Sequence, residues 1–419
     1  MTKPETTVER PQHISETNVP EEVMERLLEF EPVSAPVISI YLDARANEHG
    51  RQNFLPFVRK ELSNRSKTYP QQSRERASFE EDFVRVVRYL EEGAPASAQG
   101  IAIFACSAEN DFFEVGNFNA PFGRNRLIVS DRPHLYPLAR LIDQYRHYAV
   151  VLADTNRAQI FVFSAGRAVE RQGLQNVKTK HAKVGGWSQA RYQRHEENYH
   201  LHHAKEVVEM LDRTVGEEGI ESVILAGDEE TVIPLLREQM PKTLLEKVID
   251  VISLGIDTPE HELFEESWKA FRRHDRLTDM QKVERLLNEF RADDLAVAGV
   301  PDTLAALSNG QVEEMLIAAS PESLKYDQAE VQKVLEAYGS DGDSLADLAD
   351  LDQRAVADEL VRRANQLSSA RVTFIESATR LEQVGGVGAL LRYRITAENA
   401  APYEQADAAP RSRAMTRPS

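Results

Sequence analysis

Five residues between Gly185 and Gln189 could do chemistry at the tip of a narrow loop. The surrounding stretch, from Lys183 to Arg194, is KVGGWSQARYQR. The consecutive glycines Gly185 and Gly186 permit positive φ and carry no side-chain bulk, so this backbone can approach another chain closely. Gln189 does not titrate and cannot be a general base, but its amide can orient a water molecule and donate to a developing oxyanion. The pattern indicates a loop able to position water.

Positive charge flanks this loop. Between residues 156 and 205 the chain has nine lysines and arginines, three acidic residues and five histidines, although the whole protein carries a formal charge of −18. A basic patch on an acidic chain predicts one docking point for a polyanion, with phosphate contacts from Lys178, Lys180, Lys183, Arg191 and Arg194. Two plainer interpretations stay open: a solvated basic loop, and a strand-to-helix connection with Ser188 as the helix N-cap.

The composition limits the other possibilities. With 419 residues the chain predicts two to four domains, and its net charge argues against coating nucleic acid along its length. Cys106 is the single cysteine, which excludes an internal disulfide and a cysteine-rich metal site. The first twenty residues contain no apolar leader, so we expect a cytoplasmic protein. We expect neither a metal nor a cofactor, because His195, His200, His202 and His203 are poorly spaced for zinc. RNA contacts or simple exposure explain these histidines better.

Hydrophobic patterning predicts the elements that position the loop. We expect residues 1–20 to be a disordered tail, and residues 21–145 to form a domain of helices and strands, with one strand over 36–44. A middle domain over 146–275 begins with a hairpin of strands at 148–154 and 158–166, to which residues 168–177 could add a third strand. The basic loop then opens a long helix from about Arg191 to Val215, with an apolar stripe from Ala204 to Val215 in its C-terminal half. A buried strand at 222–228 follows, and then a helix at 229–239 whose N-terminus has an acidic cluster at 228–230, stabilised by the helix dipole. Residues 244–254 fit a helix or a strand equally well.

The last domain, over 276–397, follows a highly charged helical stretch at 259–294. Residues 301–319 predict a helix, an Asn-Gly turn and a strand, and residues 351–367 predict an amphipathic helix. Strands at 371–377 and 387–395 complete an expected α/β/α sandwich, and residues 398–419 an Ala/Pro-rich disordered tail. The predicted class is therefore mixed α/β in three domains, each a small mixed sheet with packed helices.

Two motifs in this order resemble the archaeal and eukaryotic class-one peptide release factors. The first is KTKHAKVGGWSQARYQRH, and the second is GVPDTLAALSNGQVEEMLIAAS with the later VGGVGALLRYRI. The likeness is to bacterial relatives of that family and to peptidyl-tRNA hydrolases that free nascent chains from stalled large subunits. In release factors a glutamine follows the two glycines, whereas Trp187 stands here and Gln189 lies further along, in a G-x-x-Q arrangement similar to the nascent-chain hydrolase branch. The stop-codon loop of the first domain has no matching motif between Leu62 and Pro70.

The resemblance implies roles for these residues. Gly185 and Gly186 would let the tip enter the peptidyl-transferase centre, and Gln189 would position water against the peptidyl-tRNA ester. Ribosomal RNA or tRNA would be bound by the cations above together with Trp187, Ser188 and His195. The third domain would dock on a translational GTPase, which its acidic stretch at 340–353 suits. The resemblance implies a ribosome-rescue peptidyl-tRNA hydrolase. The alternatives are an A-site-binding hibernation or stress factor that cleaves nothing and, less strongly supported, a nuclease acting near the tRNA acceptor end.

Overall fold

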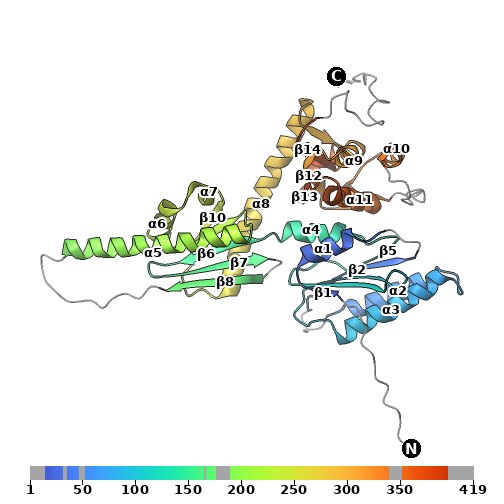
Figure 1. Ribbon diagram of the computed structural model, residues 1–419, viewed down its shortest axis with the longest axis horizontal. Helices are drawn as coiled ribbons and strands as arrows, with labels where there is room; N and C mark the ends of the chain where they lie inside the picture. The colour runs from blue at the N-terminus through green and yellow to red at the C-terminus, as the bar shows by residue number, and fades with distance from the viewer. Residues whose placement is uncertain are drawn as a thin grey trace, which may run out of the picture. The chain divides into compact units, whose positions relative to one another are not determined.

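The computed structural model describes residues 15–31, 35–46, 52–164, 167–175, 189–338 and 352–394 (Figure 1). Contacts divide the chain into two compact units. One unit combines Met1–Gln144 with Asp279–Ser419, and the other is Tyr145–Thr278. The predicted class is confirmed, because three separate mixed sheets with packed helices form the described fold. The division into three independent domains stays a prediction, since the first and third sheets belong to the same unit.

The N-terminal sheet has the strand order β1-β4-β3-β2-β5. Its strands are β1 (Ser15–Thr17), β2 (Val37–Asp43), β3 (Gly100–Cys106), β4 (Phe112–Phe118) and β5 (Arg126–Ser130). Helices α2 (Phe54–Ser66) and α3 (Arg74–Glu92) pack through apolar side chains on one face, while α1 (Pro20–Leu28) and α4 (Tyr136–Gln144) lie on the other (Figure 1). Strand β1 corrects part of the predicted disordered tail, because Ser15–Thr17 pair in parallel with Glu114–Gly116 of β4.

The middle unit is a sheet of order β10-β9-β6-β7-β8 with helices on both faces. The predicted hairpin is confirmed as antiparallel β6 (Tyr148–Ala153) and β7 (Arg157–Ser164), and the third strand as β8 (Arg167–Gln175). The long helix α5 (Gln189–Glu217) and α6 (Val232–Gln239) cover one face. The N-terminal part of α8 (Glu260–Arg291) covers the other. Strand β9 is Val223–Gly227, and the ambiguous stretch divides into α7 (Lys242–Leu245) and β10 (Val248–Ile252).

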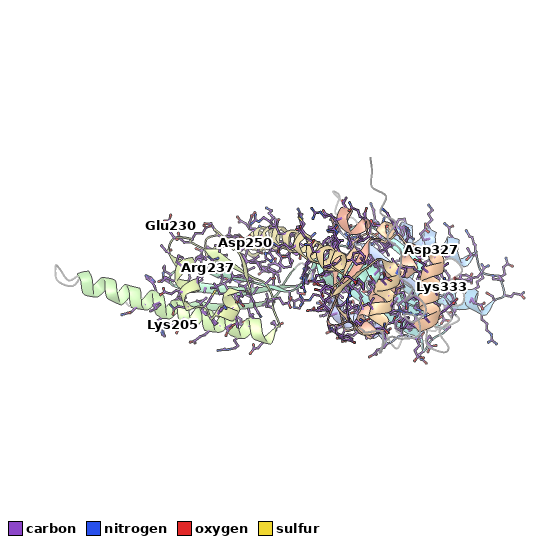
Figure 2. The ribbon with its side chains drawn as sticks, turned by 90° about the horizontal axis from the view of Figure 1, so that it is seen from above. Lys205, Glu230, Arg237, Asp250, Asp327 and Lys333 are labelled. Atoms are coloured by element: carbon purple, nitrogen blue, oxygen red, sulfur yellow. The ribbon has the colours of Figure 1, made fainter. Side chains whose placement is uncertain are left out.

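Acidic residues precede α6, as the sequence predicts. Asp228 Oδ1 accepts hydrogen bonds from the backbone N–H groups of Glu230 and Thr231 at 3.0 and 2.8 Å, which stabilises the turn before the helix. Glu230 there and Lys205 on α5 extend outward as exposed charges (Figure 2). This acidic cluster therefore has a structural role in the turn.

The C-terminal sheet confirms the expected α/β/α sandwich, with strand order β11-β14-β12-β13. The strands are β11 (Ala296–Ala298), β12 (Val312–Ala318), β13 (Arg371–Ile375) and β14 (Val387–Leu391). One face is covered by the end of α8 and by α12 (Thr379–Glu382), the other by α9 (Val300–Ser308), α10 (Gln328–Tyr338) and α11 (Gln353–Gln366). A short 3₁₀ turn, η1 (Pro321–Ser323), follows β12.

Glycines fix the entry into β14. Gly385 and Gly386 have φ of 101° and 80°, and a Cβ on Gly386 would lie 2.5 Å from the backbone oxygen of Ser323. These two glycines therefore lead into a core strand and allow the close approach of the turn after β12. Within the described residues no helix is both long enough and apolar enough to cross a membrane.

Candidate functional site

The predicted loop is attached at one edge of the middle sheet. Strand β8 ends at Gln175, which pairs with Arg157 at the start of β7, and α5 begins at Gln189. Because β6, β9 and β10 run parallel, they all end at the same edge of the sheet, where antiparallel β7 begins and β8 ends. We call this the carboxyl edge of the middle sheet. Ligand sites of α/β sheets commonly lie at such edges.

Helix α5 connects the loop to a rigid base. Its C-terminal half buries Ala204, Val207, Val208, Leu211 and Val215 against the sheet, as the sequence predicts. Residues 189–203 precede this apolar stripe, and at the α-helical rise they span about 22 Å. Figure 1 shows the N-terminal turns of α5 running past the ends of the strands. A helix held at one half and projecting at the other can carry its first residues away from the core.

An ion-pair network braces the carboxyl edge. Asp154 directly follows β6, and its Oδ1 accepts hydrogen bonds from the backbone N–H groups of Asn156 and Arg157 at 2.7 and 2.6 Å. The Arg157 guanidinium then donates to both oxygens of Asp257 at 2.8 and 3.2 Å. This hydrogen bonding from Arg157 lowers the pKa of Asp257. The two strands therefore meet in a turn whose charges are already paired with each other.

The histidines of α5 divide between the helix base and solvent. His200 Nδ1 donates to the backbone oxygen of Thr155 at 3.1 Å, which joins the helix to the β6–β7 turn. His203 is 3 % exposed, and burial lowers its pKa, so it is neutral at pH 7. His202 is exposed, with Nε2 3.4 Å from Glu206. The expectation of RNA contact or exposure was therefore wrong for His203, because the helix face that begins there turns into the core.

The residues assigned to the loop chemistry have different places in this structure. Gln189 is the first residue of α5, and Arg191, Arg194 and His195 lie within its first two turns. The remaining predicted residues lie outside the described residues: Lys178, Lys180, Lys183, Gly185, Gly186, Trp187 and Ser188. Their roles remain predictions. Both segments that hold the loop, the end of β8 and the start of α5, belong to the same compact unit.

Sequence reasoning missed the brace at the carboxyl edge. Asp154 and Arg157 flank the Thr-Asn turn of the predicted hairpin, and an acid followed by a turn was a usable signal for local backbone capping. The contribution of Asp257, a hundred residues further along, had no local signal. Among the described residues, no group of three His, Cys, Asp or Glu side chains is arranged to hold a metal ion.

Two family models match consecutive parts of the chain. Residues 133–272 match the bacterial archaeo-eukaryotic release factor family 10, and this range contains the carboxyl edge, the loop and α5. Residues 277–395 match eRF1 domain 3, which includes the C-terminal sandwich. The N-terminal sheet lies before both matches.

Individual relatives are more distant. The chain is 24 % identical over 302 residues to the eukaryotic peptide chain release factor subunit 1 of Saccharomyces cerevisiae. The aligned region covers 66 % of this chain and 69 % of that protein. A model of ribosome-bound archaeal Pelota and ABCE1 is 13 % identical, with a TM-score of 0.40 over 91 % of this chain and 96 % of that one. The crystal structure of the archaeal translation termination factor aRF1 is 16 % identical, with a TM-score of 0.25 over 89 % and 97 %. On these two consecutive matches, the chain is similar to bacterial archaeo-eukaryotic release factors over residues 133–272 and to the third domain of eRF1 over residues 277–395.

Proposed function

We propose that this protein enters the ribosomal A site and hydrolyses peptidyl-tRNA, with Gln189 positioning the attacking water. Water adds to the ester carbonyl, the bond to the tRNA ribose oxygen breaks, and the products are a peptide carboxylate and a tRNA hydroxyl. An amide suits this task because it orients water without being consumed, while the ribosome supplies the remaining electrostatic stabilisation. The family 10 match across the loop is the observation that carries the proposal.

The design of α5 supports it. An amide that acts inside an RNA cavity must project beyond the surface of its own domain, and its distance from the domain core must be fixed. Gln189 begins a helix of 29 residues whose far half is packed into the core, and His200 fixes the middle of that helix to the Thr155 turn. The local excess of cations would compensate RNA phosphates around the tip.

We also propose a translational GTPase as the partner of the C-terminal sandwich, from its match to eRF1 domain 3. The acidic stretch assigned to this contact lies mostly outside the described residues, but Asp352 at its end accepts hydrogen bonds from the first N–H groups of α11, Arg354 and Ala355, at 3.0 and 2.8 Å. That stretch therefore ends against a well-formed helix of the sandwich.

A release assay tests the catalytic proposal. Ribosomes carrying labelled peptidyl-tRNA are incubated with the wild type, Gln189→Ala, or the control Gln328→Ala, which alters an exposed glutamine on α10. Removing the water-positioning amide is expected to slow release about 100-fold, in the range for losing one oriented donor, while the control keeps the wild-type rate. Full activity in Gln189→Ala would exclude this residue from the chemistry.

Ribosome binding measured in parallel separates the alternative. Affinity is expected to fall steeply with salt, and Lys180→Ala is expected to flatten that dependence, whereas the exposed Lys242→Ala on α7 leaves it unchanged. Trp187 in the place of the family glutamine favours the second candidate, an A-site binder that cleaves nothing. Tight, salt-sensitive binding without release by the wild type would establish that function instead.

A further inference from the structure

A cleft of about 690 Å³ lies within the discontinuous unit, away from the loop-bearing unit. One wall is the β4–β5 connection with the start of β5, residues 121–128, and α4 forms another. The turn after β12, residues 319–322, closes the cleft from the C-terminal sandwich. That turn stands at the carboxyl end of β12, which runs parallel to β13, so the cleft has the location typical of ligand sites in α/β sheets.

The lining is positively charged. Four arginines contribute to it, namely Arg124, Arg126, Arg140 and Arg354, against two acidic side chains, Glu61 and Glu322. This excess of two positive charges occurs in a chain whose net charge is −18. Random placement on such an acidic protein would favour the opposite sign. The local field of the cleft therefore attracts anions.

Among these arginines, only Arg126 forms no ion pair within 4.0 Å with a described residue. Arg140 pairs with Glu376 at 2.8 Å, and Glu322 lies 3.8 Å from Arg124 and 4.0 Å from Arg354. The Arg126 side chain lines the cleft and makes no hydrogen bond or ion pair with another described side chain, and Glu322 attracts it only from beyond ion-pair distance. Burial, followed by repulsion from Arg124 and Arg140, lowers the pKa of Arg126 to about 10. A half-buried cation without a partner is costly, and a bound anion removes that cost.

The size and the other walls narrow the kind of anion. A free phosphate ion is much smaller than this volume, which lies within the range of small-molecule sites, roughly 300–1,000 Å³. Phe57, Phe122 and Tyr136 also line the cleft and offer aromatic surface. The planar guanidinium groups match phosphate oxygens in a bidentate manner. The cleft thus combines a phosphate-binding group with room for a flat ring.

We propose that this cleft binds a phosphorylated small molecule of nucleotide size, with Arg126 as the central phosphate contact and Arg124 and Arg140 beside it. The phosphate displaces the Glu322 carboxylate as the nearest anion to Arg124. Because Glu322 and Arg354 come from the C-terminal sandwich and Arg126 from the N-terminal sheet, an occupied cleft holds these two parts together. The proposal is independent of the hydrolase function, since none of its residues lies in the loop-bearing unit.

Calorimetric titration of the full chain without ribosomes tests this site. The probes are AMP, ADP, GDP, inorganic phosphate, adenosine and a short RNA oligonucleotide. Saturable binding of at least one nucleotide is expected, with Kd raised about tenfold or more in Arg126→Gln, as losing a charged hydrogen bond requires. The control Arg237→Gln, on an exposed arginine of α6, is expected to bind like the wild type.

A second variant distinguishes the loss of a phosphate contact from misfolding. Glu322→Gln removes the carboxylate that competes with the ligand, so it is expected to tighten nucleotide binding while Arg126→Gln weakens it. The proposal is overturned if no nucleotide binds saturably, or if binding is the same in both variants as in the wild type. Phosphate binding as strong as nucleotide binding, or binding of the RNA alone, would equally overturn it.

Discussion

Asp82 on α3 is a buried carboxyl group whose environment opposes its charge. Its side chain is fully buried, its Oδ2 accepts from the backbone N–H of Ser107 at 2.9 Å, and Arg85 lies 3.5 Å from Oδ1. Burial outweighs these contacts and raises the pKa of Asp82 to about 6. A carboxyl group whose pKa is raised by folding binds a proton more readily in the folded than in the unfolded chain. Its contribution to stability is therefore greatest below its unfolded pKa of 3.8.

This predicts a pH effect with a definite sign. Between pH 4 and pH 6 the stabilising contribution of protonated Asp82 disappears, which amounts to about 3 kcal/mol for a shift of this size. Asp82→Asn keeps the acceptor for Ser107 without the charge, so its unfolding free energy is expected to fall less over that interval. Denaturant titrations at several pH values measure the difference from wild type. Glu92→Gln, which changes an exposed carboxylate at the end of α3, should follow the wild-type curve, and identical curves for all three proteins would contradict the expectation.

At the scale of elements, α5 is where sequence and structure agree best. The apolar spacing from Ala204 to Val215 predicted its buried face, because a helix of this length repeats its pattern several times.

The short stretch at 244–254 gave no such repeat, and the chain uses it for both a helical turn and β10. Strand β1 was missed because its Ser-Glu-Thr sequence has no strand pattern and is ordered by pairing with β4. The candidate loop was found from glycines and charge, whereas the unpaired state of Arg126 depends on tertiary burial and has no local signal.

The anchoring of α5 leads to a prediction about stability. Leu211 is completely buried in the middle unit, so Leu211→Ala is expected to lower the unfolding free energy of that unit by about 3 kcal/mol. The proposed release activity should persist at low temperature because the loop residues are unchanged, and it should be lost at a lower temperature than in wild type. Thermal inactivation curves beside the exposed-site variant Glu209→Ala measure this. An unchanged inactivation temperature would mean that α5 is not anchored through this side chain.

At the scale of the whole molecule, the discontinuous unit is held by polar contacts across several hundred residues of sequence. Asp358 on α11 accepts from the backbone N–H groups of Leu135 and Tyr136 and lies 3.2 Å from His134 Nδ1. Asp143 accepts from the backbone N–H of Phe374 at 2.8 Å. The sequence predicted the two sheets but not this association, because contacts between distant segments leave no periodic pattern.

Removing the central carboxylate tests that association. Burial opposes the charge of Asp358, but His134, Arg362 and the backbone donor of Leu135 together lower its pKa. Asp358→Ala leaves these partners unsatisfied and is expected to cost about 3–5 kcal/mol, with Asp358→Asn intermediate because one acceptor oxygen remains. Hydrogen exchange of Leu135 and Tyr136 amides and denaturant unfolding report the effect. Because a depressed carboxyl pKa stabilises only the ionised form, the difference between wild type and Asp358→Asn should shrink as the solution is acidified. A difference that grows on acidification would contradict this assignment.

The two ends of the loop-bearing unit are neighbours. Tyr145, its first residue, stacks on Trp268 with ring centroids 4.8 Å apart, and Arg146 pairs with Asp275 a few residues before the unit ends. An inserted domain whose first and last residues lie close together can be replaced or removed without changing the fold of the domain that contains it. A different loop-bearing domain could therefore replace Tyr145–Thr278. A short linker between Gln144 and Asp279 should give a protein that keeps the discontinuous unit and lacks the loop.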